Sequence, residues 1–173
     1  MLTVGAIIIA LLAVQGSDAT APKRIGFTVP KAPWMMGVPA DTFDVTEQKL
    51  KPDGTAGYFL LTKGTGGLTV SLFIEPVKTC STAVACREWA WKAEQTRLKD
   101  IQNVQMSEVG EAAVVEYLQP AVGKVAIDQE NMHAYFVKDG YWIDFHLSQV
   151  AYKPADHGRF VDFVRGIDFG PKK

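Results

Sequence analysis

Lys138-Asp139-Gly140-Tyr141 is the part of the sequence that most constrains the fold. Asp-Gly suits both central positions of a two-residue type I′ hairpin loop. A loop of this length fixes which residues face each other across the two strands, and it places His133 opposite His146. A slip of one residue would pair polar positions with apolar ones. We therefore predict an antiparallel pair of strands over residues 131–137 and 141–149.

The two faces of this hairpin differ sharply in polarity. One face is apolar and is predicted to point into the core: Met132, Ala134, Phe136, Ile143, Phe145 and Leu147. The opposite face carries the polar side chains: Asn131, His133, Tyr135, Asp144, His146 and Ser148. Alternation of this kind is typical of an antiparallel sheet with one buried face.

The polar face brings together two of the three histidines. Directly opposed side chains have Cβ atoms about 4.5–5.5 Å apart, and Asp144 is the diagonal neighbour of His133. His133, Asp144 and His146 therefore form a candidate metal site, for which zinc or copper is the suitable ion. The alternatives are a polar sheet face whose histidines bond to their neighbours, and a pH-sensitive surface. Two histidines and one aspartate fall short of a closed ligand set.

The remaining strands are indicated by short apolar or β-branched runs between turn residues. Three precede the long helix: Thr42–Leu50, Gly57–Thr62 and Leu68–Glu75, the last two joined by a hairpin loop over 63–67. Two more lie before the histidine hairpin: Val104–Glu108 and Ala112–Leu118. The segment before residue 42 is expected to be extended and interrupted by prolines.

Two helices are predicted. The first spans Ser81–Lys99, which lacks Gly and Pro, with Ser81 or Thr82 as its N-cap. The second is short, with Asp156 as its cap and Gly166 at its end, and residues 167–169 are expected to return to the sheet. Because strands are joined by short loops, the fold class is α+β, with a mainly antiparallel sheet and helices packed on its faces.

This order of elements, together with the closing run Phe160-Val161-Asp162-Phe163-Val164-Arg165-Gly166-Ile167-Asp168-Phe169, resembles the PsbP-like family. That family is named for the extrinsic protein of oxygen-evolving photosystem II, and the resemblance covers Phe43 to Phe169. It implies an α/β/α sandwich around an antiparallel sheet. It also implies a non-catalytic assembly or accessory role and supplies no catalytic residues.

The N-terminal segment reads as a targeting signal. Residues 1–17 carry no charged side chain, and Ser17 with Ala19 fits a signal-peptidase site, as does Ala19 with Ala21. The first basic residues, Lys23 and Arg24, come after the apolar run rather than before it. We predict that residues 1–19 are a secretory signal peptide, or an N-terminal anchor if retained. Residues 22–173 are predicted to form a single globular PsbP-like domain.

Cys80 and Cys86 flank the start of the long predicted helix. In an oxidising compartment such a pair is expected to form a local disulfide. The spacing is not Cys-x-x-Cys, so a thioredoxin-like exchange role is not supported.

Four apolar side chains are candidate partner contacts: Trp34, Met35, Met36 and Trp91. Trp34-Met35-Met36 lies between prolines and is interpreted either as an interface or as part of a covered sheet edge. On the long helix, Trp89 aligns with Ala85, Cys86 and Ala93 and is expected to face the core. Trp91 is expected to be the less buried of the two tryptophans.

Charge and the absence of known motifs exclude further classes of function. The net charge is −1 and the 18 basic residues are scattered, so no nucleic-acid partner is expected. The sequence has neither a P-loop nor a Gly-x-Ser-x-Gly elbow. We expect a secreted or periplasmic accessory protein, not an enzyme, that binds a protein partner in an envelope or membrane complex. Contact with the membrane itself is expected only through an uncleaved N-terminal segment. The alternative is a metal- or small-ligand-binding carrier that uses the histidine pair, and no other cofactor is expected.

Overall fold

The computed structural model describes residues 23–40 and 43–172. It contains two helices, α1 (Ala83–Glu94) and α2 (His157–Arg165), and two short 3-10 turns at Thr65–Gly67 and Pro154–Asp156. The strands are β1 (Arg24–Phe27), β2 (Trp34–Pro39), β3 (Asp44–Leu50), β4 (Gly57–Thr62), β5 (Thr69–Pro76), β6 (Gln102–Val109), β7 (Ala112–Val122), β8 (Val125–Lys138), β9 (Tyr141–Gln149) and β10 (Asp168–Pro171).

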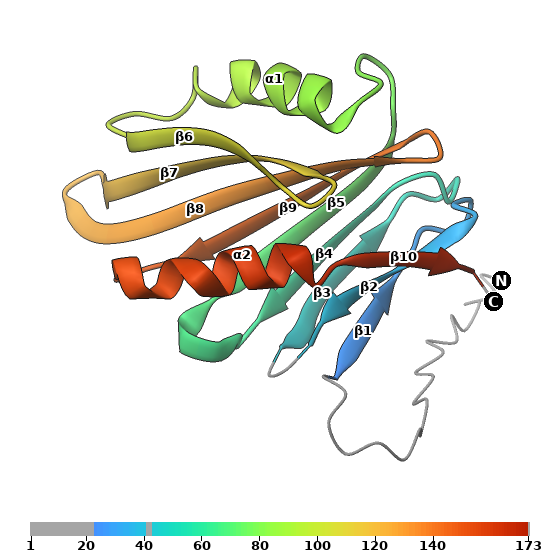
Figure 1. Cartoon of the computed structure of the whole chain (residues 1–173), viewed down its shortest axis with the longest axis horizontal. Coiled ribbons are helices and arrows are strands. Elements are labelled where there is room, and N and C mark those ends of the chain that lie inside the picture. Colours follow the sequence, from blue (N-terminus) through green and yellow to red (C-terminus); the bar gives the residue numbers. More distant parts are fainter. Residues whose placement is uncertain (1–22, 41–42, 173) are drawn as a thin grey trace, which may run out of the picture.

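The strands form two antiparallel sheets. The large sheet has seven strands in the order β3-β4-β5-β9-β8-β7-β6, and the small sheet has three in the order β1-β2-β10. Helix α1 lies over one face of the large sheet, whereas α2 and the small sheet lie on the other side (Figure 1). The predicted fold class, a mainly antiparallel sheet with helices on its faces, is confirmed.

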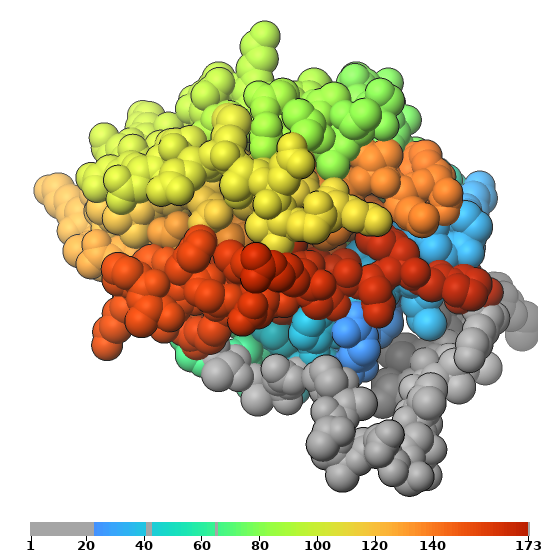
Figure 2. All heavy atoms as spheres, viewed as in Figure 1, coloured from blue at the N-terminus to red at the C-terminus, as the bar shows by residue number. Residues whose placement is uncertain are grey.

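The main core lies between the large sheet, the small sheet and α2. Its centre is formed by side chains with no solvent exposure, including Met36, Val38, Leu72, Phe145 and Phe160. Helix α2 buries Phe160, Phe163 and Val164, whose spacing of three and four residues places them on one side of the helix. From α2 the chain continues directly into β10, and the two form an unbroken red band across the molecule (Figure 2).

The hairpin β8–β9 has the predicted register. Asp139 and Gly140 both have positive φ, 47° and 78°, as a type I′ turn requires. His133 is paired with His146 across the strands. The six apolar side chains predicted for the inner face are all buried: Met132, Ala134, Phe136, Ile143, Phe145 and Leu147.

The N-terminal segment differs from the expectation of a merely extended chain. It forms β1 and β2, and β10 joins β2 rather than the large sheet. Trp34 and Met36 are therefore side chains of the central strand of the small sheet and are buried, at 3% and 0% exposure. The Trp34 ring contacts Tyr141 and Phe169 edge-on. This corrects the interpretation of Trp34 and Met36 as surface contacts for a partner, because both are inside the domain; Met35 is half-buried.

Helix α1 begins at the predicted N-cap, Thr82, whose side chain accepts a hydrogen bond from the Ala85 amide. It ends at Glu94, earlier than predicted. Our expectation for its tryptophans was wrong: Trp91 is 5% exposed, whereas Trp89 is 48% exposed. The buried stripe runs through Cys86, Arg87 and Trp91, and Trp89 lies off it. Trp91 is consequently not an available partner contact.

The burial of the two tryptophans was predicted wrongly because the buried stripe of α1 contains a charged residue. Arg87 is only 8% exposed, and its guanidinium donates to the carbonyl oxygens of Ser107 and Val114 and pairs with Glu88. An apolar periodicity therefore does not reveal the packed side. At the start of the helix, the disulfide between Cys80 and Cys86 is confirmed, with a Cα–Cα distance of 5.0 Å.

The end of β7 and the start of α2 also differ from the prediction. Strand β7 runs on to Val122 through a register shift between Gln119 and Ala121, so that β7 and β8 form a longer hairpin than predicted. Asp156 lies at the start of α2, but its carboxylate accepts from the Lys153 amide and the Gln149 side chain instead of capping that helix.

Residues 1–19, predicted to be a signal peptide or an anchor, lie outside the described part of the chain. Within residues 23–40 and 43–172, no helix has the length and apolar character needed to cross a bilayer.

Candidate functional site

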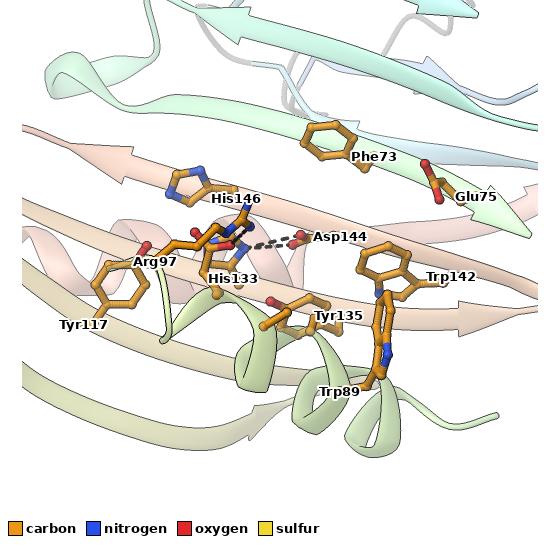
Figure 3. Close-up of a pocket in the computed structure, with 13 residues that line it drawn as sticks. Phe73, Glu75, Trp89, Arg97, Tyr117, His133, Tyr135, Trp142, Asp144 and His146 are labelled. Carbon is orange, nitrogen blue, oxygen red and sulfur yellow. Dashed lines mark hydrogen bonds and ion pairs between the residues drawn. The ribbon is translucent and has the colours of Figure 1, made fainter. Parts of the chain in front are cut away.

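A pocket of about 400 Å³ opens on the outer face of the large sheet, between α1 and strand β5. Strands β7, β8 and β9 form its floor (Figure 3). The walls and floor are rich in aromatic and ionisable side chains, including Phe73, Glu75, Trp89, Arg97, Tyr117 and Trp142. His133, Asp144 and His146, predicted from the hairpin register, are all brought together in it.

His133 and Asp144 form a polar contact in the floor of the pocket. Both residues are 9% exposed. The Nδ1 atom of His133 lies 3.1 Å and 3.4 Å from the two carboxylate oxygens of Asp144. The carboxylate accepts this hydrogen bond, so the Nδ1 atom carries the proton. Nε2 of His133 is buried and has no hydrogen-bond partner among the described residues.

His146 is held by a different neighbour. Its Nε2 atom lies 3.0 Å from Oδ1 of Asn131, an amide oxygen that accepts the hydrogen bond. Asn131 is in turn fixed by the side chain and the carbonyl oxygen of Gln129. Removal of the ring from water, reinforced by the nearby imidazole of His133, lowers the pKa of His146 to about 3. His146 is therefore a neutral hydrogen-bond donor at neutral pH.

The arrangement does not form the predicted zinc or copper site at His133, Asp144 and His146. The two imidazole rings are stacked, at an angle of 3° and with centroids 4.3 Å apart. Nitrogen lone pairs lie in the ring plane, so parallel rings do not direct them onto one ion. In the part of the chain that the structure describes, no group of three His, Cys, Asp or Glu side chains is placed to hold a metal ion.

Aromatic rings instead extend across the floor as an offset row. Tyr117 and Tyr135 lie on either side of His133, with ring centroids 6.2 Å and 5.8 Å from it. Trp142 continues the row beyond Tyr135 at 6.2 Å. Trp89 of α1 stands at 87° to Trp142, with centroids 5.6 Å apart, and the two indoles form one end of the pocket (Figure 3).

The charged groups of the pocket are mainly acidic. Glu94, the last residue of α1, and Arg97, in the turn that follows it, form an ion pair with each other, and Asp144 is bonded to His133. Burial raises the pKa values of Tyr117 and Tyr135, and the carboxylates of Glu94 and Asp144 raise both further. These two phenols therefore experience a negative electrostatic potential from the site.

The sequence predicted the histidines and Asp144 but not the remaining walls of the pocket. Phe73 and Glu75 belong to the outer face of β5, and Trp89 comes from α1. The sequence pattern does indicate that Phe73 and Glu75 lie on the outer face, because they alternate with the buried Leu72 and Ile74. The position of α1 above them was not readable from spacing.

No family model matches the chain, and no curated protein matches it. The solution structure of cyanobacterial PsbP (CyanoP) from Synechocystis sp. PCC 6803 matches with a TM-score of 0.51. The match covers 93% of this chain and 99% of that chain. The chain has a PsbP-like fold.

The sequences of the two proteins are only 11% identical, so the likeness is one of fold. The PsbP-like architecture expected from the order of elements is thereby confirmed over almost the whole length of both chains. The properties of the pocket follow from this chain's own side chains.

Proposed function

We propose that this PsbP-like protein is a non-catalytic accessory protein that binds a larger protein complex of the envelope or of a membrane. The resemblance to the PsbP-like family supports an accessory role. The docking surface is the outer face of the large sheet beside α1, because the inner face is covered by α2 and the small sheet.

The observation that carries this proposal is a pair of exposed aromatic side chains on that face. Phe73 of β5 is 39% exposed and Trp89 of α1 is 48% exposed, and both line the pocket. The fold does not require Trp89, since Trp91 supplies the buried indole of α1. Aromatic side chains are enriched at the centres of protein interfaces. A protein partner seated over the pocket would cover both rings.

The proposed compartment is outside the cytosol, either periplasmic or secreted. The Cys80–Cys86 disulfide supports this, because disulfides persist in oxidising compartments and are rare in the cytosol. The predicted signal peptide over residues 1–19 is consistent with the same location. Alkylation of free thiols during rapid lysis of the host measures the state of the pair, and a fully reduced pair would contradict this location.

The docking surface is tested by site-specific photocrosslinking in the native host. A photoreactive amino acid replaces Phe73 or Trp89 in separate variants, and Val122, 57% exposed at the tip of the β7–β8 hairpin, serves as the matched control. We expect one discrete adduct from positions 73 and 89 and none of that mass from position 122. Excess unmodified protein should compete the adduct away.

The identity of the crosslinked protein completes the test. A subunit of an envelope or membrane complex that crosslinks at both aromatic positions supports the proposal. An adduct formed equally well at position 122, or no adduct at 73 and 89 in either the soluble or the membrane fraction, overturns it.

A further inference from the structure

We propose that the pocket under α1 binds an organic ammonium group, held by the indoles of Trp89 and Trp142 and by the carboxylates around them. This goes beyond docking on a protein complex and does not depend on it. The shared chemistry is a positively charged nitrogen that carries alkyl groups. A free choline-like compound and a lysine-like primary amine are the two sources that the experiment separates.

The first argument is the aromatic end of the pocket. The faces of aromatic rings are electron-rich, and a cation within about 6 Å of a ring centroid is attracted to them, most strongly by tryptophan. Trp89 and Trp142 stand nearly perpendicular to each other, so their surfaces form a corner rather than a flat stack. Tyr135 continues the aromatic surface from Trp142. A rounded alkylammonium group fits such a corner better than a planar ligand does.

The second argument is charge. Three carboxylates line the pocket, those of Glu75, Glu94 and Asp144, against one guanidinium, that of Arg97. Arg97 pairs with Glu94, which leaves Glu75 without an ion-pair partner among the described residues. His146 is neutral at physiological pH and does not offset this excess of negative charge. The pocket therefore favours a cation.

The third argument is a buried nitrogen that the fold leaves unused. His133 is 9% exposed and lines the pocket, and its Nδ1 atom donates to Asp144. In the neutral ring the lone pair of Nε2 then has no donor within the described residues. Buried polar atoms are normally satisfied, so an unpartnered acceptor in a pocket indicates a missing donor. Because Nε2 is itself out of contact with solvent, an N–H group of a primary ammonium ligand would pair with it once the side chains over it are displaced.

Size is compatible with this ligand. A volume of about 400 Å³ lies at the lower end of the range of small-molecule pockets, roughly 300–1,000 Å³. The pocket can therefore hold an alkylammonium group together with a short chain, and two of its lining side chains, Phe73 and Trp89, are exposed to solvent.

The test is a titration of the folded domain followed by NMR of the tryptophan indole N–H signals. The probes are tetramethylammonium and choline for the quaternary class and n-butylammonium for the primary class. The neutral isostere 3,3-dimethylbutan-1-ol is the control for shape alone. We expect saturable shifts of the Trp89 and Trp142 signals with at least one ammonium probe and much weaker binding of the alcohol. Preference between the classes distinguishes a choline-like source from a lysine-like one.

Substitutions of residues at the rim locate the binding site while the domain remains folded. Trp89→Ala removes one indole and Glu75→Gln removes one charge, and each should weaken binding by about two- to fivefold. Arg97→Gln should strengthen binding, because it frees the Glu94 carboxylate and removes the competing cation. The matched control is Glu108→Gln, an exposed glutamate of β6 outside the pocket, which should leave the affinity unchanged.

Three results would overturn the proposal: equal binding of the neutral alcohol, undiminished affinity in Trp89→Ala, or no saturation by either ammonium class. None of them concerns the protein complex, so they are distinct from the failure of the crosslinking experiment.

Discussion

The imidazole rings of His133 and His146 lie face to face, with centroids 4.3 Å apart, on adjacent strands of the large sheet. Each ring is held by its own partner: Asp144 for His133 and Asn131 for His146. Burial of the ring, reinforced by the imidazole of His133, makes protonation unfavourable at His146. This has a consequence for stability.

Acidification should destabilise the domain through His146. Its pKa is lowered to about 3 in the folded state, whereas an unfolded chain has a histidine pKa of about 6.5. Between these values the unfolded state binds more protons, so the free energy of unfolding falls as the pH drops, by at most about 1.4 kcal/mol per pH unit. Urea unfolding at a series of pH values from 7 to 4 measures this slope.

The His146→Gln variant isolates that contribution, because glutamine does not titrate. Burial raises the pKa values of Glu116 and Glu130, which contributes a slope of the opposite sign in both proteins. We expect the variant to lose less stability than the parent over the same pH interval. Equal slopes would show that His146 titrates normally.

The two tryptophans of α1 should differ in their effect on stability. Trp91 is buried against Tyr117, so Trp91→Ala should lower the free energy of unfolding by about 3–5 kcal/mol. Trp89 is half-exposed and contacts Trp142 edge-on, so Trp89→Ala should lower it by about 1 kcal/mol. Thermal and urea unfolding of the two variants check the ranking, and a reversed order would contradict the assignment of the packed side of α1.

Loss of the disulfide should have a moderate effect. The bond joins residues six positions apart, and closure of such a short loop stabilises the folded state by about 2 kcal/mol. The double variant Cys80→Ser with Cys86→Ser should therefore melt at a lower temperature than the oxidised protein. Added reductant should lower the melting temperature of the parent only, and an effect of reductant on the double variant would point to another cause.

Substitution by alanine at Gly140 and at Gly158 should change the stability of the domain in opposite directions. Gly140 has a φ of 78° in the hairpin turn, a conformation that costs other residues about 1–2 kcal/mol. Gly158 lies in α2 with open space around the position of an added Cβ, so Gly158→Ala should raise stability by about 0.5 kcal/mol. Chemical denaturation of both variants tests this pair, and stabilisation by Gly140→Ala would rule out the type I′ turn.

The part of the site that could be predicted depends on a local rule. The Asp139-Gly140 turn determines the register of its two strands, and the register determines that His133, Asp144 and His146 are neighbours. Ring orientation is a different matter, because it depends on the hydrogen bonds of Asp144 and Asn131. Whether the two histidines can share a metal ion is decided at that level, by ring orientation, and the register does not encode it.

The small sheet and the packing of α1 could not be predicted for a different reason. Strand β2 is paired with β10, more than 120 residues later in the chain, and no local pattern encodes such a pairing. In α1 the buried side contains Arg87, so its apolar residues alone do not mark the packed stripe. For the same reason the exposure of Trp89 could not be predicted, nor could its place at the aromatic rim of the pocket.

The pairing of β2 with β10 also determines when this domain can be completed during synthesis. Strand β2 has β1 on one side, but its other neighbour consists of Asp168–Pro171. Lys172 then donates from its ammonium group to the carbonyl oxygens of Val29 and Pro30. The small sheet therefore cannot close on a growing chain, and Trp34 remains uncovered by Phe169, until Asp168–Pro171 has left the ribosome.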